Sequence, residues 1–211
     1  MTYMKKGFLF LFLGFLLCFS SCKGFANKNI SNNPNILIVY DSRYGATKLT
    51  SEWIAEGIKE NVKVLYVGDF KDKDLEGVDF LLIGSPIFKG EIVTANMANF
   101  IKGKKERLSN IPVGLFTVCG TYLVWGDEYL KNFENLVKNN IPNANIKFKK
   151  AFGGRIIPEK LNDSDKEKMD EYWRSRGVDK IKKEDFMDKE VCVRFGREVK
   201  EMLIASLNKE K

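Results

Sequence analysis

The chain has 211 residues and a formal net charge of +7, with four cysteines and no histidine. This length suits one domain with a sizeable core and is too short for two ordinary domains. The lack of histidine excludes serine–histidine and cysteine–histidine catalysis and imidazole metal sites, so we expect no metal. No block of lysines and arginines is interleaved with aromatic residues, and we therefore expect no nucleic-acid partner. Redox or group-transfer chemistry would need a borrowed cofactor.

The first residues are typical of an export signal. Two lysines precede the apolar run 7–19, and Phe-Ser-Ser-Cys, which resembles a bacterial lipobox, ends at Cys22. The run has 13 residues, whereas a membrane-spanning helix needs about 20. We predict a lipoprotein-type signal peptide over 1–21 and a lipid on Cys22, which would anchor the protein to the membrane outside the cytoplasm. An uncleaved N-terminal membrane anchor is the alternative.

Strand and helix patterns alternate along the remaining chain. Short apolar runs predict strands at 35–40, 62–67, 80–86, 112–120 and 145–154, and helical spacing predicts helices at 47–60, 93–101, 128–137 and 188–207. Buried parallel strands need crossovers, so this order predicts an α/β fold with an open, doubly wound parallel sheet and helices on both faces.

The domain organisation follows from the same pattern. Residues 22–34 are polar and rich in asparagine, which predicts a flexible tether, and 35–207 form the domain. A charged insertion at about 155–187 separates the last predicted strand from the last helix, and its middle, 163–174, is predicted as a surface helix. A segment of this length at the carboxyl edge of a sheet carries function or is a solvated decoration.

The loop after the first strand is suited to an anion. Its hydroxyls, its glycine and its backbone N–H groups stand where a helix begins, and no carboxylate follows Asp41 until Glu52. We expect it to bind a terminal phosphate, and an ordinary capped turn is the alternative. The residues expected to hold the phosphate are Ser42, Arg43, Tyr44, Gly45, Ala46 and Thr47.

The loops after the third and fourth strands reach the same edge of the sheet, where ligands of such folds bind. Apolar and aromatic side chains there suit the two faces of a flat ring, although each one alone could cap the core. The expected ring contacts from the earlier loop are Ser85, Pro86, Ile87, Phe88, Lys89 and Gly90. The expected ring contacts from the later loop are Cys119, Gly120, Thr121, Tyr122 and Trp125.

Cys119 and Cys192 are the cysteines that remain after the export segment, and they form no CxxC motif. Outside the cytoplasm they could pair as a disulfide. Two cysteines so far apart in sequence are more often buried core residues, and we favour that interpretation.

These motifs resemble one known family. "ILIVYDSRYGAT", "DFLLIGSPIFKGEI", "AFGGRI" and "EDFMDKEVCVRFGREVKEML" look like the flavodoxin-domain family that includes menaquinone-dependent protoporphyrinogen oxidase. The resemblance covers about 35–205 and implies a flavodoxin-like five-stranded sheet of order 2-1-3-4-5 that binds flavin mononucleotide (FMN) noncovalently. The resemblance also places the insertion at about 155–187 where the oxidase carries its characteristic insertion. No catalytic residue of the oxidase can be matched in this segment.

Three functions are compatible with this resemblance. The first is an FMN-binding redox protein that passes electrons to a partner protein or a quinone. The second is a quinone-coupled dehydrogenase of the protoporphyrinogen oxidase type. The third is a flavodoxin-fold binding module without flavin. Substrate-dependent flavin reduction distinguishes the first two, and the flavin absorbance of the purified protein tests the third.

The lipobox predicts the effect of Cys22→Ala. Because the thiol is the lipid acceptor, the variant should remain an uncleaved precursor or leave the membrane fraction. Metabolic labelling with a radioactive fatty acid, followed by membrane fractionation, measures both outcomes. Unchanged labelling and membrane attachment would show that Cys22 is not the anchor.

Overall fold

The computed structural model describes residues 33–88, 91–120, 122–175, 177–179 and 183–208. The predicted signal peptide and most of the predicted tether, Cys22 included, lie outside these ranges. The described strands are β1 (Ile36–Tyr40), β2 (Val62–Tyr66), β3 (Phe80–Pro86), β4 (Val113–Cys119), β5 (Ile146–Gly153), β6 (Arg155–Ile156) and β7 (Glu184–Asp185). The described α-helices are α1 (Ala46–Ile58), α2 (Ala95–Gly103), α3 (Lys105–Leu108), α4 (Tyr122–Asn140), α5 (Asp163–Arg174) and α6 (Lys189–Asn208).

Five of the strands form one parallel sheet in the order β2-β1-β3-β4-β5. The predicted flavodoxin-like α/β fold and its strand order 2-1-3-4-5 are therefore confirmed. Strand β1 runs between β2 and β3, so the chain order reverses direction beside it. The carboxyl ends of β1 and β3 are thus neighbours, which brings the loops that follow them together.

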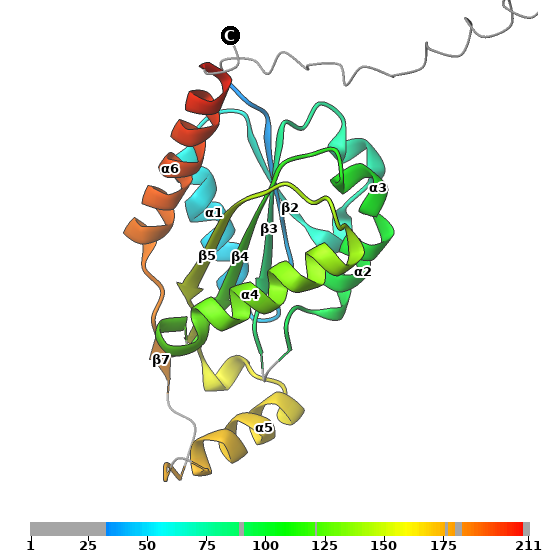
Figure 1. Cartoon of the computed structure of the whole chain (residues 1–211). Helices are drawn as coiled ribbons and strands as arrows, with labels where there is room; N and C mark the ends of the chain where they lie inside the picture. Colours follow the sequence, from blue (N-terminus) through cyan, green and yellow to red (C-terminus); the bar gives the residue numbers. More distant parts are fainter. Residues whose placement is uncertain (1–32, 89–90, 121, 176, 180–182, 209–211) are drawn as a thin grey trace, which may run out of the picture.

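The sheet separates two apolar cores (Figure 1). Successive side chains of a strand point to opposite faces, so Ile36 and Ile38 enter one core and Leu37 and Val39 enter the other. Helices α1 and α6 cover the first core, and α2, α3 and α4 cover the second. All five residues of β1 are buried, because both faces of the strand are covered.

One predicted boundary is wrong. The sequence predicted a loop over 119–127 and a helix from 128, but α4 begins at Tyr122. Gly126, which suggested a loop, lies inside the helix and is buried. An isolated glycine is tolerated inside a helix, so its presence does not by itself mark a loop.

The insertion is tied to the sheet at its base. Strand β6 pairs antiparallel with β7, a pairing that the sequence did not predict, and α5 has the predicted bounds of the surface helix. A Cβ on Gly153 would lie 1.8 Å from the backbone oxygen of Phe186, so only glycine lets the returning chain approach. Figure 1 shows α5 beyond the carboxyl ends of the strands.

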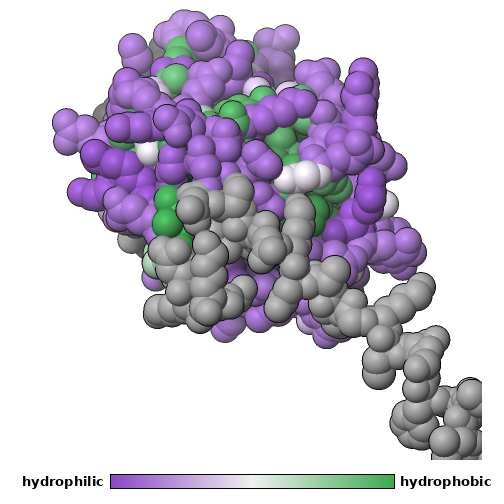
Figure 2. Space-filling model, turned by 90° about the horizontal axis from the view of Figure 1, so that it is seen from above, coloured by the Kyte–Doolittle hydropathy of each residue, from purple (hydrophilic) through white to green (hydrophobic). Residues whose placement is uncertain are grey.

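The end of the molecule opposite α5 is seen in a space-filling view. Figure 2 views that end, and most of its coloured surface is hydrophilic, with small apolar areas between. Among the residues that the structure describes, no helix combines the length and the apolar composition that a membrane span requires.

Helices α1 and α6 pack so closely that only glycine fits at two crossing positions. A Cβ on Gly57 would lie 2.0 Å from the carbonyl oxygen of Val193, and a Cβ on Gly196 would lie 2.1 Å from that of Ile54. The backbones of the two helices are thus in direct contact on the side of α1 that faces the core.

We predict that Gly57→Ala destabilises the domain, because the added methyl group must push two helices apart. Overpacking of this kind costs about 1–3 kcal/mol of unfolding free energy. The control is Gly103→Ala at the end of α2, where a Cβ would meet no atom within 4 Å. Urea unfolding followed by circular dichroism should show a lower midpoint for the first variant, and an unchanged or higher midpoint for the second.

Candidate functional site

The loop between β1 and α1 is shaped by its own polar groups. Ser42 donates its N–H to Asp41 Oδ1 at 2.7 Å, and Ser42 Oγ accepts the N–H of Gly45 at 3.1 Å. Gly45 has a φ of 88°, a left-handed conformation that favours glycine, and a Cβ there would meet no atom within 4 Å. Gly45 stays a predicted phosphate contact, and its backbone conformation is a separate reason for glycine at this position.

The amino end of α1 carries unused donors. The helix begins at Ala46, so Thr47 lies in its first turn. No side chain caps this end, and the first turn contains no acidic residue. The hydroxyl of Thr47 is buried without a hydrogen-bond partner in the part of the chain that the structure describes. An uncapped helix start with a spare buried hydroxyl is suited to an anion.

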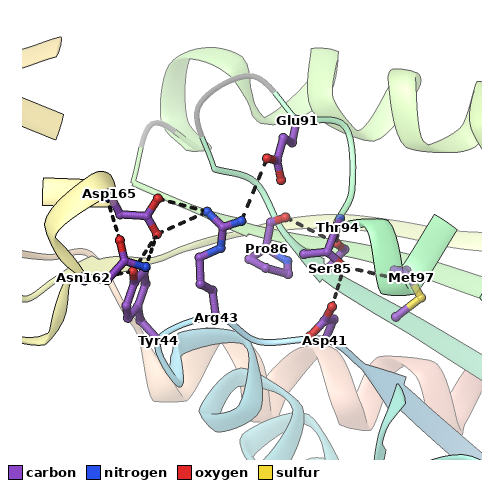
Figure 3. A network of polar contacts seen from close by, with 10 residues as sticks. All are labelled: Asp41, Arg43, Tyr44, Ser85, Pro86, Glu91, Thr94, Met97, Asn162 and Asp165. Carbon is purple, nitrogen blue, oxygen red and sulfur yellow. Dashed lines mark hydrogen bonds and ion pairs between the residues drawn. The ribbon is translucent and has the colours of Figure 1, made fainter. Parts of the chain in front are cut away.

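A second network joins the loops after β1 and β3 (Figure 3). Thr94 donates its hydroxyl to Asp41 Oδ2 at 2.5 Å, and it donates its N–H to Ser85 Oγ at 3.2 Å. Thr94 Oγ1 also caps α2 by accepting the N–H of Met97 at 3.3 Å. Asp41 and Thr94 thus fix the two loops, a role that the sequence analysis missed although Thr94 stands at a readable cap position.

A cavity of about 740 Å³ opens between these loops and the insertion. This volume is within the roughly 300–1,000 Å³ of ligand sites. The predicted site residues that line the cavity are Ser42, Arg43, Tyr44, Ala46, Thr47, Pro86, Ile87, Phe88, Cys119, Gly120 and Trp125. Their role in binding a cofactor stays a prediction.

The other predicted site residues have different places. Ser85 and Gly45 do not line the cavity, and the hydroxyl of Ser85 instead contacts Thr94 and Pro86. Lys89, Gly90 and Thr121 lie outside the described residues. Tyr122 is the first residue of α4, and its side chain also lies outside the description.

Two aromatic side chains of α4 stand at the cavity. Trp125 is 46% exposed and lines the cavity together with Tyr129, one helical turn later. The sequence analysis missed Tyr129, because it placed Trp125 on a loop, where a spacing of four residues has no meaning. In a helix, residues four apart share a face.

The insertion supplies the opposite wall of the cavity. We call β6, the short 3-10 helix η3 (Pro158–Lys160), α5 and β7 the flap. The flap and its flanks contribute mainly apolar and aromatic side chains, together with two basic groups and one acidic group. These residues are Arg155, Ile156, Leu161, Lys168, Met169, Tyr172, Trp173, Glu184 and Phe186.

The flap contacts the β1–α1 loop through one carboxylate (Figure 3). Asp165 is 4% exposed, and its Oδ2 accepts the hydroxyl of Tyr44 at 2.5 Å and lies 3.3 Å from Arg43 Nη1. Arg43 also lies 3.9 Å from Glu91 Oε1 and 4.8 Å from the ring centre of Phe88. Burial and the bond to Asp165 raise the pKa of Tyr44, so the phenol stays protonated and donates.

The two cysteines do not form the disulfide that the sequence left open. Cys119 ends β4 at the cavity, and Cys192 is buried in the core between α1 and α6. Burial and the nearby Asp188 carboxylate raise the pKa of the Cys192 thiol to about 12. A thiol of this kind is a core residue with little reactivity. Within the described ranges, no group of three or more acidic or thiol side chains is placed to hold a metal ion.

The sequence of residues 37–182 matches the flavodoxin domain family. The chain belongs to this family. Membership supports a flavin cofactor and a redox function in general terms, and it agrees with the position of the cavity at the switch point of the sheet. No curated protein is similar enough to the chain to count as a relative.

Several solved structures are similar to the chain. The chain is 17% identical to an archaeal flavodoxin, covering 79% of this chain and 96% of that one with a TM-score of 0.46. The chain is 18% identical to the two-electron-reduced flavodoxin of Megasphaera elsdenii. The match covers 79% of this chain and 98% of that one, with a TM-score of 0.49. Rubredoxin oxygen:oxidoreductase from Desulfovibrio gigas has 16% identity and a TM-score of 0.50, with 84% of this chain and 37% of that chain covered. At these identities the similarity concerns the fold.

Proposed function

We propose that the protein binds FMN and transfers electrons. The observation that carries this proposal is the amino end of α1, where no side chain caps the helix and Thr47 keeps a buried hydroxyl without a partner. The carboxylate of Asp41, which directly precedes the loop, is already engaged by Ser42 and Thr94. A terminal phosphate fits this set of donors, because the helix dipole and the spare N–H groups favour negative charge.

Different residues of the chain would bind the phosphate and the ring of FMN. Ser42, Thr47 and the first turn of α1 would hold the phosphate, and Phe88 and Trp125 offer aromatic surface for the ring. Bound FMN would supply one- and two-electron chemistry that the side chains lack. Arg43 adds little net positive charge, because Asp165 and Glu91 both lie beside its guanidinium. The loop therefore binds an anion mainly by hydrogen bonds and dipoles.

A second candidate function is the reduction or oxidation of a small molecule, with a quinone as the electron acceptor. The observation that favours it is the flap wall, where aromatic side chains line the cavity and two donors, Arg155 Nε and Trp173 Nε1, are buried without partners among the described residues. A quinone has a flat apolar ring for such a wall and carbonyl oxygens for such donors. Protoporphyrinogen oxidase chemistry is the version of this function that the family resemblance suggested.

The cellular setting is also a proposal. The lipobox supports a lipid anchor at Cys22 and a domain that works outside the cytoplasmic membrane, with an uncleaved anchor as the alternative. A membrane-bound quinone or a redox partner protein would then be within reach.

The competing hypothesis is a binding module without flavin, and the flavin absorbance of the purified protein tests it. If the purified mature protein shows no flavin absorbance and gains none when titrated with FMN, the proposal of a flavoprotein is wrong.

We predict that Thr47→Val weakens FMN binding by about tenfold to one hundredfold, since a hydrogen bond to a charged group contributes roughly 1.5–3 kcal/mol. Riboflavin, which lacks the phosphate, should bind both proteins equally. Fluorescence titration of the flavin-free protein measures the two affinities.

The matched control for this prediction is Thr50→Val. Thr50 is equally buried one turn further along α1, but it does not line the cavity. Equal losses of FMN and riboflavin in Thr47→Val, or the same loss in the control, would assign the hydroxyl a structural role.

We predict that Trp173→Phe slows quinone reduction by the flavin-loaded, reduced protein about five- to tenfold, because one hydrogen bond to the acceptor is lost. Flavin affinity and electron transfer to ferricyanide should not change. Stopped-flow absorbance measures both rates, and Trp53→Phe, away from the cavity in the α1–α6 core, is the control. A quinone rate that is unaffected by Trp173→Phe would favour the carrier function.

A further inference from the structure

The contact between Asp165 and the β1–α1 loop has features that a chance surface contact lacks. The carboxylate is 4% exposed, and it comes from a segment that lies 121 positions after Tyr44 in the sequence. A buried carboxylate persists only when it is paired and hydrogen-bonded. Asp165 meets this condition with groups from both sides of the cavity (Figure 3).

On the loop side, Asp165 holds the two long side chains of the predicted phosphate loop. Tyr44 donates its hydroxyl at 2.5 Å, and Arg43 Nη1 lies 3.3 Å from Oδ2 and 3.4 Å from Oδ1. The ring of Tyr44 packs against Phe88 with ring centroids 6.4 Å apart. These contacts fix side chains that neighbour Ser42 and Thr47, the candidate phosphate donors.

On the flap side, Asp165 belongs to the first turn of α5. Its N–H donates to Asn162 Oδ1 at 2.8 Å, and Asn162 Nδ2 donates to Asp165 Oδ2 at 3.4 Å. The N–H of Asn162 in turn donates to the hydroxyl of Tyr44 at 3.3 Å. The start of α5 and the phosphate loop therefore share one hydrogen-bond network.

We infer that Asp165 is a positioning residue that latches the flap to the loop Ser42–Thr47. The latch makes the flap wall and the phosphate loop one cooperative unit, so a ligand leaves the cavity only when this unit opens. The consequence for ligand release rests on the proposed function, whereas the latch itself does not. Asp165 touches the loop's side chains and is assigned no contact with the ligand.

The first experiment uses hydrogen exchange of the flavin-free mature chain. In Asp165→Ala, the amides of α5 should exchange about tenfold faster or more, because hydrogen bonds to a buried charge are lost. The amides of β1, β3 and β4 should keep their protection, which shows that the domain remains folded. The matched control is Asp163→Ala, which removes the same charge from an exposed position in the same helical turn.

A second variant guards against a local folding defect in α5. Tyr44→Phe leaves the helix sequence intact and removes only the hydroxyl, and it should raise the exchange of α5 in the same direction. Asp165 and Tyr44 act through one hydrogen bond. The increase in the α5 exchange rate in the double variant should therefore be smaller than the product of the increases in the two single variants. Unchanged exchange of α5 in both single variants would overturn the latch.

The second experiment measures ligand release. FMN and riboflavin should both dissociate about tenfold faster from Asp165→Ala than from Asp163→Ala, because the flap covers the ring rather than the phosphate alone. A faster release of FMN only would mean that Asp165 acts on the phosphate and not as a latch. If the exchange results hold but the unmodified protein binds neither flavin, the latch stands and the proposed function fails.

Discussion

The parallel sheet is the constraint on which the site depends. Parallel strands need crossover helices, so both faces of the sheet are covered and only its edges remain for a ligand. The order β2-β1-β3-β4-β5 places the loops after β1 and β3 next to each other at the carboxyl edge. Asp41 turns this proximity into a fixed geometry, because it bonds Ser42 in one loop and Thr94 in the other.

The second feature is the way the flap joins the sheet. Gly153 ends β5 where the chain returns through Phe186, and a side chain at this position would collide with the returning backbone. The β6–β7 pair then closes the base of the insertion, and Asp165 joins its far side to the β1–α1 loop. The insertion is thus anchored at two places, so its aromatic side chains form a wall of the cavity.

The net positive charge of the chain is not the proposed source of phosphate affinity. The chain as a whole is basic, yet Arg43 in the phosphate loop is flanked by the carboxylates of Asp165 and Glu91. Phosphate affinity in this chain would therefore come from the helix start and from Thr47. Trp173 and Arg155 line the same cavity, and each keeps a buried donor without a partner among the described residues, which is the basis for proposing a small electron acceptor.

The sequence by itself determined the fold class, the strand order implied by the family resemblance, and most of the cavity-lining loop residues. These depend on local patterns: apolar runs such as 80–86 form strands because both faces are buried, and a glycine after β1 permits the left-handed turn that leads into α1. Only the tertiary structure decided the start of α4, the pairing of β6 with β7 and the contact of Asp165 with Tyr44. The last two depend on groups far apart in the sequence, and no local spacing encodes which distant partner a buried carboxylate or a short strand will meet.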